Sequence, residues 1–474
     1  MSKYYYRKIM ILGIISILFF MSINTANSGF ITSDNHKEMT SIITTNLASW
    51  TCMVYWVGDG KGDLPNGTFY FDKDMIKNIN MMELSGSTSK INIIVQADDL
   101  EIWGGNKGNI SGTRRYHIQY DDDMENLADY NLGENVWYIG EQNMGDPSTL
   151  KEFINWAVSS YPAEHYFLTL MGHGEGWTQF CQDYSSGGIK EPQISYFNPS
   201  TSMSIKPELN NVLSSSPHLD ILFLFGCHMG QIEVFYQLKE CADMILATEN
   251  FGAGSLPMFE IPFKNLKANP QLTSVEIAQL FVDNYNPELE PEYDFYNNWS
   301  PLFGIQTKNI DDITQAISNL TEAIIKQYDS NPIKVNQVIS NAFKQSVMET
   351  PVKNFYAPHA HELYKFAEKI CDLTKNKMSK VYNAALELLS VIDNSSIIKH
   401  SKKPNEDYHG LAVFSPPRSL PNLKCYFTVN LWGLEILPRN RYKSLDFAED
   451  TQWDKILDIM YPMRRMILKI FNID

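Results

Sequence analysis

The chain has 474 residues, of which 44% are hydrophobic and 20% charged, so it can bury a large core and is not a disordered or fibrous protein. Its formal net charge is −16 at pH 7. A chain this acidic repels phosphate backbones and anionic headgroups, which argues against binding to nucleic acid or to a membrane surface. The length fits one large α/β protein with an added subdomain, or three separate domains.

The N-terminal segment, residues 1–28, is typical of a secretory signal peptide. Basic residues precede an apolar run from Ile9 to Ile23, and small residues follow, including Ala26 and Ser28. The run is shorter than the roughly 20 residues that a membrane-spanning helix needs. We therefore expect a secreted protein with no stable membrane insertion after cleavage. An uncleaved N-terminal anchor is the alternative.

From Trp50 onward, apolar runs alternate with amphipathic stretches, which is typical of a mainly parallel sheet covered by helices. A helix is predicted after Asp146, which has the side chain of an N-cap residue and is followed by Pro147 at the first helical position. Strands are predicted from the other apolar runs, over residues 51–59, 90–99, 165–171, 219–225 and 243–250. A shorter strand or hairpin arm is predicted over residues 114–123.

The pattern changes downstream of about Asn298, where longer amphipathic helices are predicted over residues 311–328 and 361–374. We expect residues 46–297 to form the sheet domain and residues 298–474 to form a largely helical subdomain packed on the sheet. One strand-like run in this part, residues 410–417, could instead join the main sheet.

Two predicted strands end in residues that can carry chemistry. His173 lies between two glycines after one strand, and Cys227 follows Gly226 after another. Glycines leave an imidazole accessible, and a cysteine at the start of a helix has its thiolate favoured by the helix dipole. The pair supplies a nucleophile, a base and backbone donors for an oxyanion, as thiol catalysis requires. A buried core cysteine and an ordinary loop histidine are the alternative.

Other candidate sites are weaker. The acidic run from Asp121 to Asp123 lacks the glycine and the terminal glutamate of an EF-hand loop, so we expect a solvated turn. Six cysteines in an exported chain predict up to three disulfides. A nucleophilic Cys227 would leave at least one other cysteine unpaired. Cys241 is expected in the core.

The segments around these two strand ends, residues 161–177 and 219–250, resemble the clostripain family of cysteine endopeptidases, which shares the caspase, gingipain and legumain fold. The resemblance extends over nearly the whole chain after the signal peptide, through residues 50–59, 114–116, 143–157 and 444–457. It implies a caspase-like catalytic domain over residues 46–297, with residues 298–474 as the C-terminal subdomain.

The resemblance also implies roles for single residues. Cys227 would be the nucleophile and His173 the general base and acid, and the backbone N–H groups of Gly174 and Cys227 would hold the oxyanion. No third catalytic residue and no cofactor is implied, and a calcium requirement stays open. His228, beside the nucleophile, is expected to point away from it. The partner would be a protein or peptide substrate.

The chain departs from the family at the substrate pocket. Family members commonly have Asp-Ala before the cysteine, and this aspartate pairs with a basic substrate residue. Here the two positions hold Phe225 and Gly226, and losing the carboxylate costs roughly 2–5 kcal/mol of preference for a basic residue. We expect an uncharged or apolar preference, unless Glu175 or Glu249 supplies the charge. The change also disfavours self-cleavage after Lys190, in the loop between the two strands.

Three functions therefore follow from the sequence. The first is a secreted cysteine endopeptidase of caspase-like fold. The second is a binding module that keeps this fold without catalysis, an alternative suggested by the altered Phe225-Gly226 pair. The third is an asparaginyl endopeptidase or transpeptidase.

Overall fold

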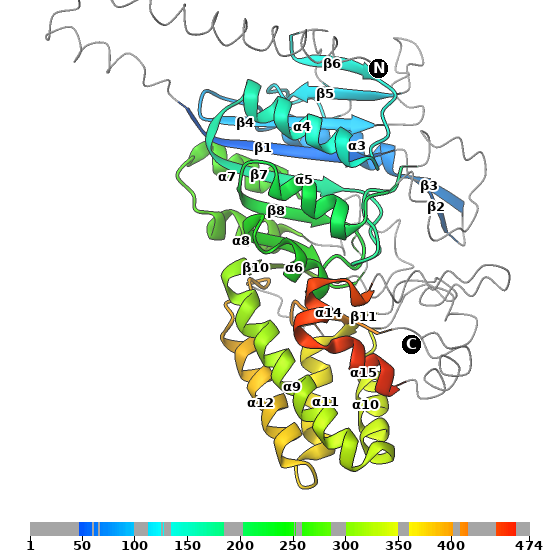
Figure 1. Ribbon diagram of the computed structural model, residues 1–474. Coiled ribbons are helices and arrows are strands. Elements are labelled where there is room, and N and C mark those ends of the chain that lie inside the picture. The colour runs from blue at the N-terminus through cyan, green and yellow to red at the C-terminus, as the bar shows by residue number, and fades with distance from the viewer. Residues whose placement is uncertain are drawn as a thin grey trace, which may run out of the picture. The chain divides into compact units, whose positions relative to one another are not determined.

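A computed structural model describes residues 47–58, 61–64, 67–98, 112–124, 127, 134–183, 202–250, 252, 258–285, 300–348, 360–401, 408–415 and 442–460. From Ala48 onward the chain forms one compact unit (Figure 1). The predicted signal peptide, residues 1–28, and the predicted cleavage position Lys190 lie outside the described residues. Among the helices that are described, none combines the length and the apolar character needed to cross a bilayer.

An eight-stranded sheet forms the centre of this unit. Its strands are, in spatial order, β10 (Leu302–Gln306), β9 (Ala242–Thr248), β8 (Leu219–Phe225), β7 (Ala163–Met171), β1 (Ala48–Val57), β4 (Ile91–Asp98), β5 (Thr113–His117) and β6 (Val136–Gly140). The five strands from β9 to β4 are parallel, and the three outer strands pair antiparallel. The prediction of a mainly parallel sheet is therefore confirmed, although β6 and β10 were not predicted.

Strand β1 shows why the sheet is covered on both faces. All ten of its residues are buried, and successive side chains point to opposite faces. Met53 and Tyr55 belong to the core on one face, whereas Val54 and Trp56 belong to the core on the other. A strand buried on both faces has a continuous apolar sequence, as parallel sheets covered by helices require.

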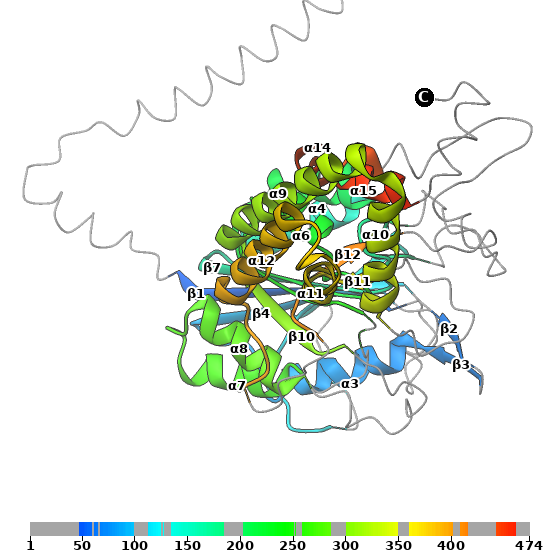
Figure 2. The same ribbon diagram turned by 90° about the horizontal axis from the view of Figure 1, so that it is seen from below.

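Helices cover both faces of the sheet (Figure 2). One face carries α4 (Pro147–Ser160), α5 (Asn210–Ser214) and α6 (Ile232–Leu238). The other carries α3 (Phe71–Glu83), α7 (Glu260–Ala268) and α8 (Ser274–Asn284). The predicted start of α4 is confirmed, because the Asp146 side chain accepts a hydrogen bond from the Ser148 N–H at 2.7 Å and Pro147 is the first helical residue. A short π-helical turn, η1 (Ile205–Leu209), precedes α5, and β2 (Lys61–Leu64) pairs with β3 (Gly67–Tyr70) in a hairpin.

The chain after β10 is mostly helical. A 3₁₀ turn, η4 (Thr307–Asn309), leads into four helices that pack side by side in Figure 1, α9 (Ile310–Ser330), α10 (Pro332–Ser346), α11 (Leu363–Thr374) and α12 (Ser379–Asn394). Two shorter helices follow, α14 (Asp446–Thr451) and α15 (Trp453–Met460). The apolar side chains of these helices share one core with α4 and α6.

Residues 410–417 were considered for the main sheet, and this alternative is wrong. The strand they contain, β12 (Ala412–Phe414), pairs with β11 (Ala360–Glu362) in a separate two-stranded sheet. The predicted domain boundary between residues 297 and 298 stays a prediction. Strand β10, which follows this position, pairs with β9 at the edge of the main sheet.

Candidate active site

The two chemical segments leave the sheet from neighbouring strands. β7 and β8 are parallel, and their last residues, Met171 and Phe225, lie opposite one another in the register. The Gly172 N–H donates a hydrogen bond to the Phe225 carbonyl at 3.3 Å. Because the carboxyl ends of parallel strands meet at one edge of the sheet, His173 and Cys227 enter the same region from two adjacent turns.

A pocket lies where these turns meet, and both His173 and Cys227 line it. The full lining comes from the ends of β1, β7 and β8 and from the segment after β9, as Trp56, Met171, Gly172, His173, Phe225, Gly226, Cys227 and Gly252. The predicted residues Phe225 and Gly226 are thus at the pocket. Trp56, Met171 and Gly252 were not predicted, although Met171 is the last residue of the apolar strand β7 and Trp56 is the last but one of β1.

Two glycines allow the turns to approach each other closely. A Cβ atom on Gly174 would lie 2.8 Å from the Cys227 carbonyl oxygen. A Cβ atom on Gly226 would lie 2.8 Å from the Gly172 carbonyl oxygen. Real side chains do not tolerate such distances. The backbone contact between the histidine turn, residues 172–177, and the cysteine turn, residues 226–230, therefore requires glycine at both positions.

The cysteine turn is fastened to the end of β9. The His228 N–H donates to the Asn250 carbonyl at 2.8 Å, and the Gly230 N–H donates to the Thr248 carbonyl at 2.8 Å. Helix α6 therefore begins only at Ile232. The prediction that Cys227 lies at the start of a helix is wrong, because these tertiary hydrogen bonds hold residues 227–230 in a turn. His228 adopts the left-handed φ of 61° and is 2% exposed, and it is absent from the pocket lining.

Cys227 is half-buried at the pocket, and its surroundings set the pKa of its thiol. Burial raises the pKa of Cys227 to about 11, a shift that the Gly252 backbone N–H opposes and the Glu175 carboxylate increases. Burial also raises the pKa of Glu175 to about 7, while a hydrogen bond with Gln179 opposes this shift. The thiol is thus protonated at neutral pH, contrary to the expectation from a helix dipole, and a base has to remove its proton.

The two carboxylates considered as replacements for the missing aspartate are not part of the described pocket lining. Glu175 lies within the histidine turn, close enough to Cys227 to raise the pKa of its thiol, and its N–H donates to the Gln179 carbonyl at 3.0 Å. Glu249 is fully buried, and its carboxylate accepts a hydrogen bond from the Gly410 N–H. The described pocket therefore has an apolar wall of Trp56, Met171 and Phe225 without a carboxylate.

The described cysteines do not form disulfides with one another. Cys52, Cys181, Cys227, Cys241 and Cys371 are all free thiols, so the prediction of up to three disulfides is wrong for this part of the chain. Each of the five belongs to a strand, helix or turn whose neighbours leave no second sulfur within bonding reach. Cys241 is 2% exposed, as a core residue would be.

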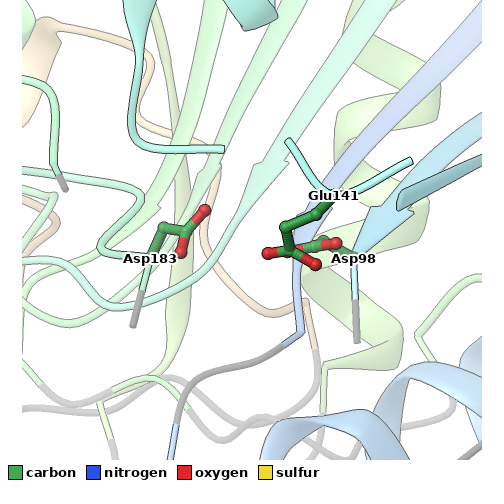
Figure 3. A group of neighbouring side chains, drawn as sticks. All are labelled: Asp98, Glu141 and Asp183. Atoms are coloured by element: carbon green, nitrogen blue, oxygen red, sulfur yellow. The ribbon is translucent and has the colours of Figure 1, made fainter. Parts of the chain in front are cut away.

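A group of carboxylates near this edge of the sheet could hold a cation. Asp98 ends β4, Glu141 follows β6 and Asp183 follows the histidine turn, and their carboxylate oxygens lie within 4.8 Å of one another (Figure 3). Calcium and magnesium prefer such oxygen ligands. Two of the carboxylates also serve the fold, since Asp98 accepts from the Thr113 hydroxyl at 2.7 Å and Asp183 from the Met144 N–H at 2.6 Å.

Comparison with known proteins gives clostripain and C11 proteases among the relatives of this chain. Clostripain from Hathewaya histolytica is 22% identical over 316 residues, an alignment that covers 58% of this chain and 58% of clostripain. The chain thus matches less than two thirds of that relative's length. An inactive zymogen C11 protease from Parabacteroides distasonis has a similar structure, with a TM-score of 0.52, 17% identity and coverage of 85% of this chain and 98% of that chain.

A second solved structure agrees with the first. A secreted C11 cysteine protease from Bacteroides thetaiotaomicron, in complex with an irreversible peptide inhibitor, has a TM-score of 0.51 at 17% identity and covers 86% of this chain and 99% of its own. These likenesses confirm the predicted fold. The sequence profile of the clostripain family matches residues 54–459, and the chain therefore belongs to the clostripain family of cysteine peptidases.

Proposed function

We propose that this chain is a secreted endopeptidase that hydrolyses peptide bonds with His173 and Cys227 as a catalytic dyad. The observation that carries the proposal is their position, since both line one pocket at the ends of two neighbouring parallel strands. Membership of the clostripain family supports the same chemistry. The signal-peptide pattern of residues 1–28 supports secretion, as does the secreted relative from Bacteroides thetaiotaomicron.

The proposed reaction begins with a proton transfer. The imidazole of His173 takes the proton from the Cys227 sulfur, and the thiolate attacks the carbonyl carbon of the substrate peptide. The N–H groups of Gly174 and Cys227 stabilise the oxyanion of the tetrahedral intermediate, by about 3–4 kcal/mol for each donor. His173 then protonates the leaving amine. Water, deprotonated by the same imidazole, hydrolyses the thioester and restores the thiol.

The raised pKa of Cys227 shapes the first step. Because burial raises it to about 11, the Cys227 thiol of the resting enzyme is protonated at pH 7. The proton moves when the substrate is bound and the developing charge is stabilised by the backbone donors. This sequence uses general-base catalysis and needs no cofactor, and calcium has no part in the proposed chemical steps.

The substrate would be a protein or peptide with an uncharged or apolar residue before the scissile bond. Trp56, Met171 and Phe225 supply an apolar pocket wall, and Phe225 stands where the family commonly has an aspartate. A guanidinium or ammonium group would lose its water here without gaining a carboxylate partner, which costs several kcal/mol. Leucine, methionine or phenylalanine would instead bury apolar surface against these side chains.

Hydrolysis of fluorogenic peptides by the purified secreted protein tests the proposal. Cys227→Ala and His173→Ala should each lower kcat/KM by at least about 10³-fold, because the two residues act as a unit. Cys241→Ala is the control, since it removes a buried thiol at another place in the core. Unchanged hydrolysis in Cys227→Ala would refute the dyad. A folded wild-type protein that binds peptides without cleaving them would favour the silent binding module.

A further inference from the structure

Gln231 links the cysteine turn to the histidine turn. It is fully buried and occupies the N-cap position of α6, where its backbone carbonyl accepts hydrogen bonds from Val234 and Phe235 at 3.0 and 3.1 Å. An N-cap side chain usually accepts a hydrogen bond from its own helix. The Gln231 side chain does not. Its Oε1 instead accepts a hydrogen bond from the Trp177 N–H at 3.1 Å.

The histidine turn is shaped to receive this side chain. Gly176 has a left-handed φ of 57°, and a Cβ atom on it would lie 2.2 Å from the Gln231 Oε1. The glutamine amide therefore rests directly on the glycine backbone, and any other residue at position 176 would displace it.

The hydrogen bond between Gln231 and Trp177 is equally far along the sequence from both reacting residues. Trp177 is four residues after His173, and Gln231 is four residues after Cys227. The turns also touch at the other end, where Gly174 contacts the Cys227 carbonyl. Together with the hydrogen bond from the Gly172 N–H to the Phe225 carbonyl, these contacts join the two turns at both ends. The hydrogen bond between Gln231 and Trp177 holds together the ends that follow Cys227 and His173.

The amide itself is hard to explain by packing. Within the described part of the chain, the buried Nε2 of Gln231 has no hydrogen-bond acceptor. A buried donor without an acceptor destabilises the folded state, and an apolar side chain of the same length would fill the space without that cost. The hydrogen bond to Trp177 is thus the one interaction that favours glutamine here over methionine.

A third element supports the same junction. The Ala412 N–H donates to the Gly230 carbonyl at 2.9 Å, and β12 runs beside Gln231. The Trp177 ring packs against Phe414 at 5.5 Å. The C-terminal part of the chain therefore holds the Gln231 backbone in place. The Gln231 side chain extends from this fixed backbone to the histidine turn.

We propose that Gln231 is a positioning residue that fixes the His173 imidazole relative to the Cys227 sulfur. The inference rests on the proposed dyad function and adds a residue to it. Gln231 does not touch the substrate or the reacting atoms. It acts by holding the two turns in one relative position, and a displacement of about 1 Å between reacting groups can cost about 100-fold in rate.

Three variants and one control test the proposal. Gln231→Met keeps the side-chain length and removes the acceptor, whereas Gln231→Glu keeps an acceptor oxygen in either protonation state. Gln231→Asn keeps the amide but is one methylene shorter, and it serves as the test if the methionine variant does not fold. Gln237→Met is the control, because Gln237 is a buried glutamine on the same helix that donates to Asp446 at 2.8 Å, away from the histidine turn.

We expect Gln231→Met to lower kcat by about 10- to 100-fold with KM changed by less than about twofold. Gln231→Glu should recover most of the kcat, and Gln237→Met should retain wild-type kcat. The second readout is the rate at which iodoacetamide alkylates Cys227 at pH 7, followed by mass spectrometry. In Gln231→Met this rate should fall toward that of His173→Ala, because the displaced imidazole no longer accepts the thiol proton as the sulfur attacks iodoacetamide.

Equal kcat values and equal alkylation rates in Gln231→Met and Gln237→Met would overturn the inference. A loss in Gln231→Met that Gln231→Glu does not recover would also overturn it, since the acceptor oxygen would then not matter. Failure of the proposed function has a different signature. In that case the wild type and Cys227→Ala hydrolyse peptides equally, whatever residue occupies position 231.

Discussion

The substrate preference can be changed by restoring a carboxylate at position 225. Phe225 is 6% exposed, and its ring packs edge-on against Phe223 at 5.4 Å and Tyr285 at 6.1 Å. Replacing such a ring with a small side chain costs about 3–5 kcal/mol of stability. Phe225→Asp and Phe225→Asn share this cost and have nearly the same shape, so the difference between them isolates the negative charge.

The charge should act on basic substrates alone. A carboxylate paired with a buried guanidinium contributes roughly 2–5 kcal/mol, or about 30-fold or more in kcat/KM. The assay measures kcat/KM for two fluorogenic peptides that differ only in arginine or leucine before the scissile bond. The arginine-to-leucine ratio should rise at least about 30-fold from Phe225→Asn to Phe225→Asp.

Two results would refute this reasoning. If the wild type already prefers arginine clearly, the apolar wall does not set the preference. If Phe225→Asp and Phe225→Asn show the same ratio while both remain folded in a thermal melt, residue 225 does not contact the substrate side chain. If both variants unfold, the same arginine-to-leucine ratio is measured in Phe225→Glu, whose longer side chain retains more of the packing.

Two further predictions follow from the buried carboxylates. Because the Glu175 carboxylate raises the pKa of Cys227 and itself has a pKa of about 7, Glu175→Gln should speed alkylation of Cys227 on the order of threefold at pH 8.5 and leave it unchanged at pH 5.5. A slower rate at pH 8.5 would contradict this. Burial raises the pKa of Glu233 from 4.5 to about 7, so its contribution to the free energy of unfolding is present below pH 4.5 and is lost as the pH rises through 7. Glu233→Gln keeps an acceptor for the Phe414 N–H and the Tyr442 hydroxyl. From pH 4.5 to pH 8, its free energy of unfolding in urea should rise by about 3 kcal/mol relative to that of the wild type. If the difference in free energy of unfolding between Glu233→Gln and the wild type stayed the same from pH 4.5 to pH 8, this prediction would be wrong.

Local signals explain what the sequence could predict. β1, β8 and the second half of β7 are buried apolar runs, and α4 has a cap and a proline in adjacent positions. Each of these features is contained within about ten residues. The strand-end rule then placed His173 and Cys227 at one edge of the sheet, because parallel neighbouring strands end together.

Contacts between distant segments explain what the sequence could not predict. The turn at residues 227–230 is held by hydrogen bonds to the end of β9. The sequence of the turn does not predict these hydrogen bonds. Burial by several segments, rather than a helix dipole, sets the pKa of Cys227. The carboxylates of Asp98, Glu141 and Asp183 come from three parts of the chain. A pattern within a single segment carries no information about such neighbours.

Covalent labelling tests the central claim most directly. A peptidyl acyloxymethyl ketone with leucine next to the reactive group is incubated with wild type, Cys227→Ala and His173→Ala, and the modified residue is located by mass spectrometry. We expect one adduct on Cys227 in the wild type, no adduct in Cys227→Ala and at least about 100-fold slower labelling in His173→Ala. Labelling of Cys227 at the same rate with and without His173 would contradict the account.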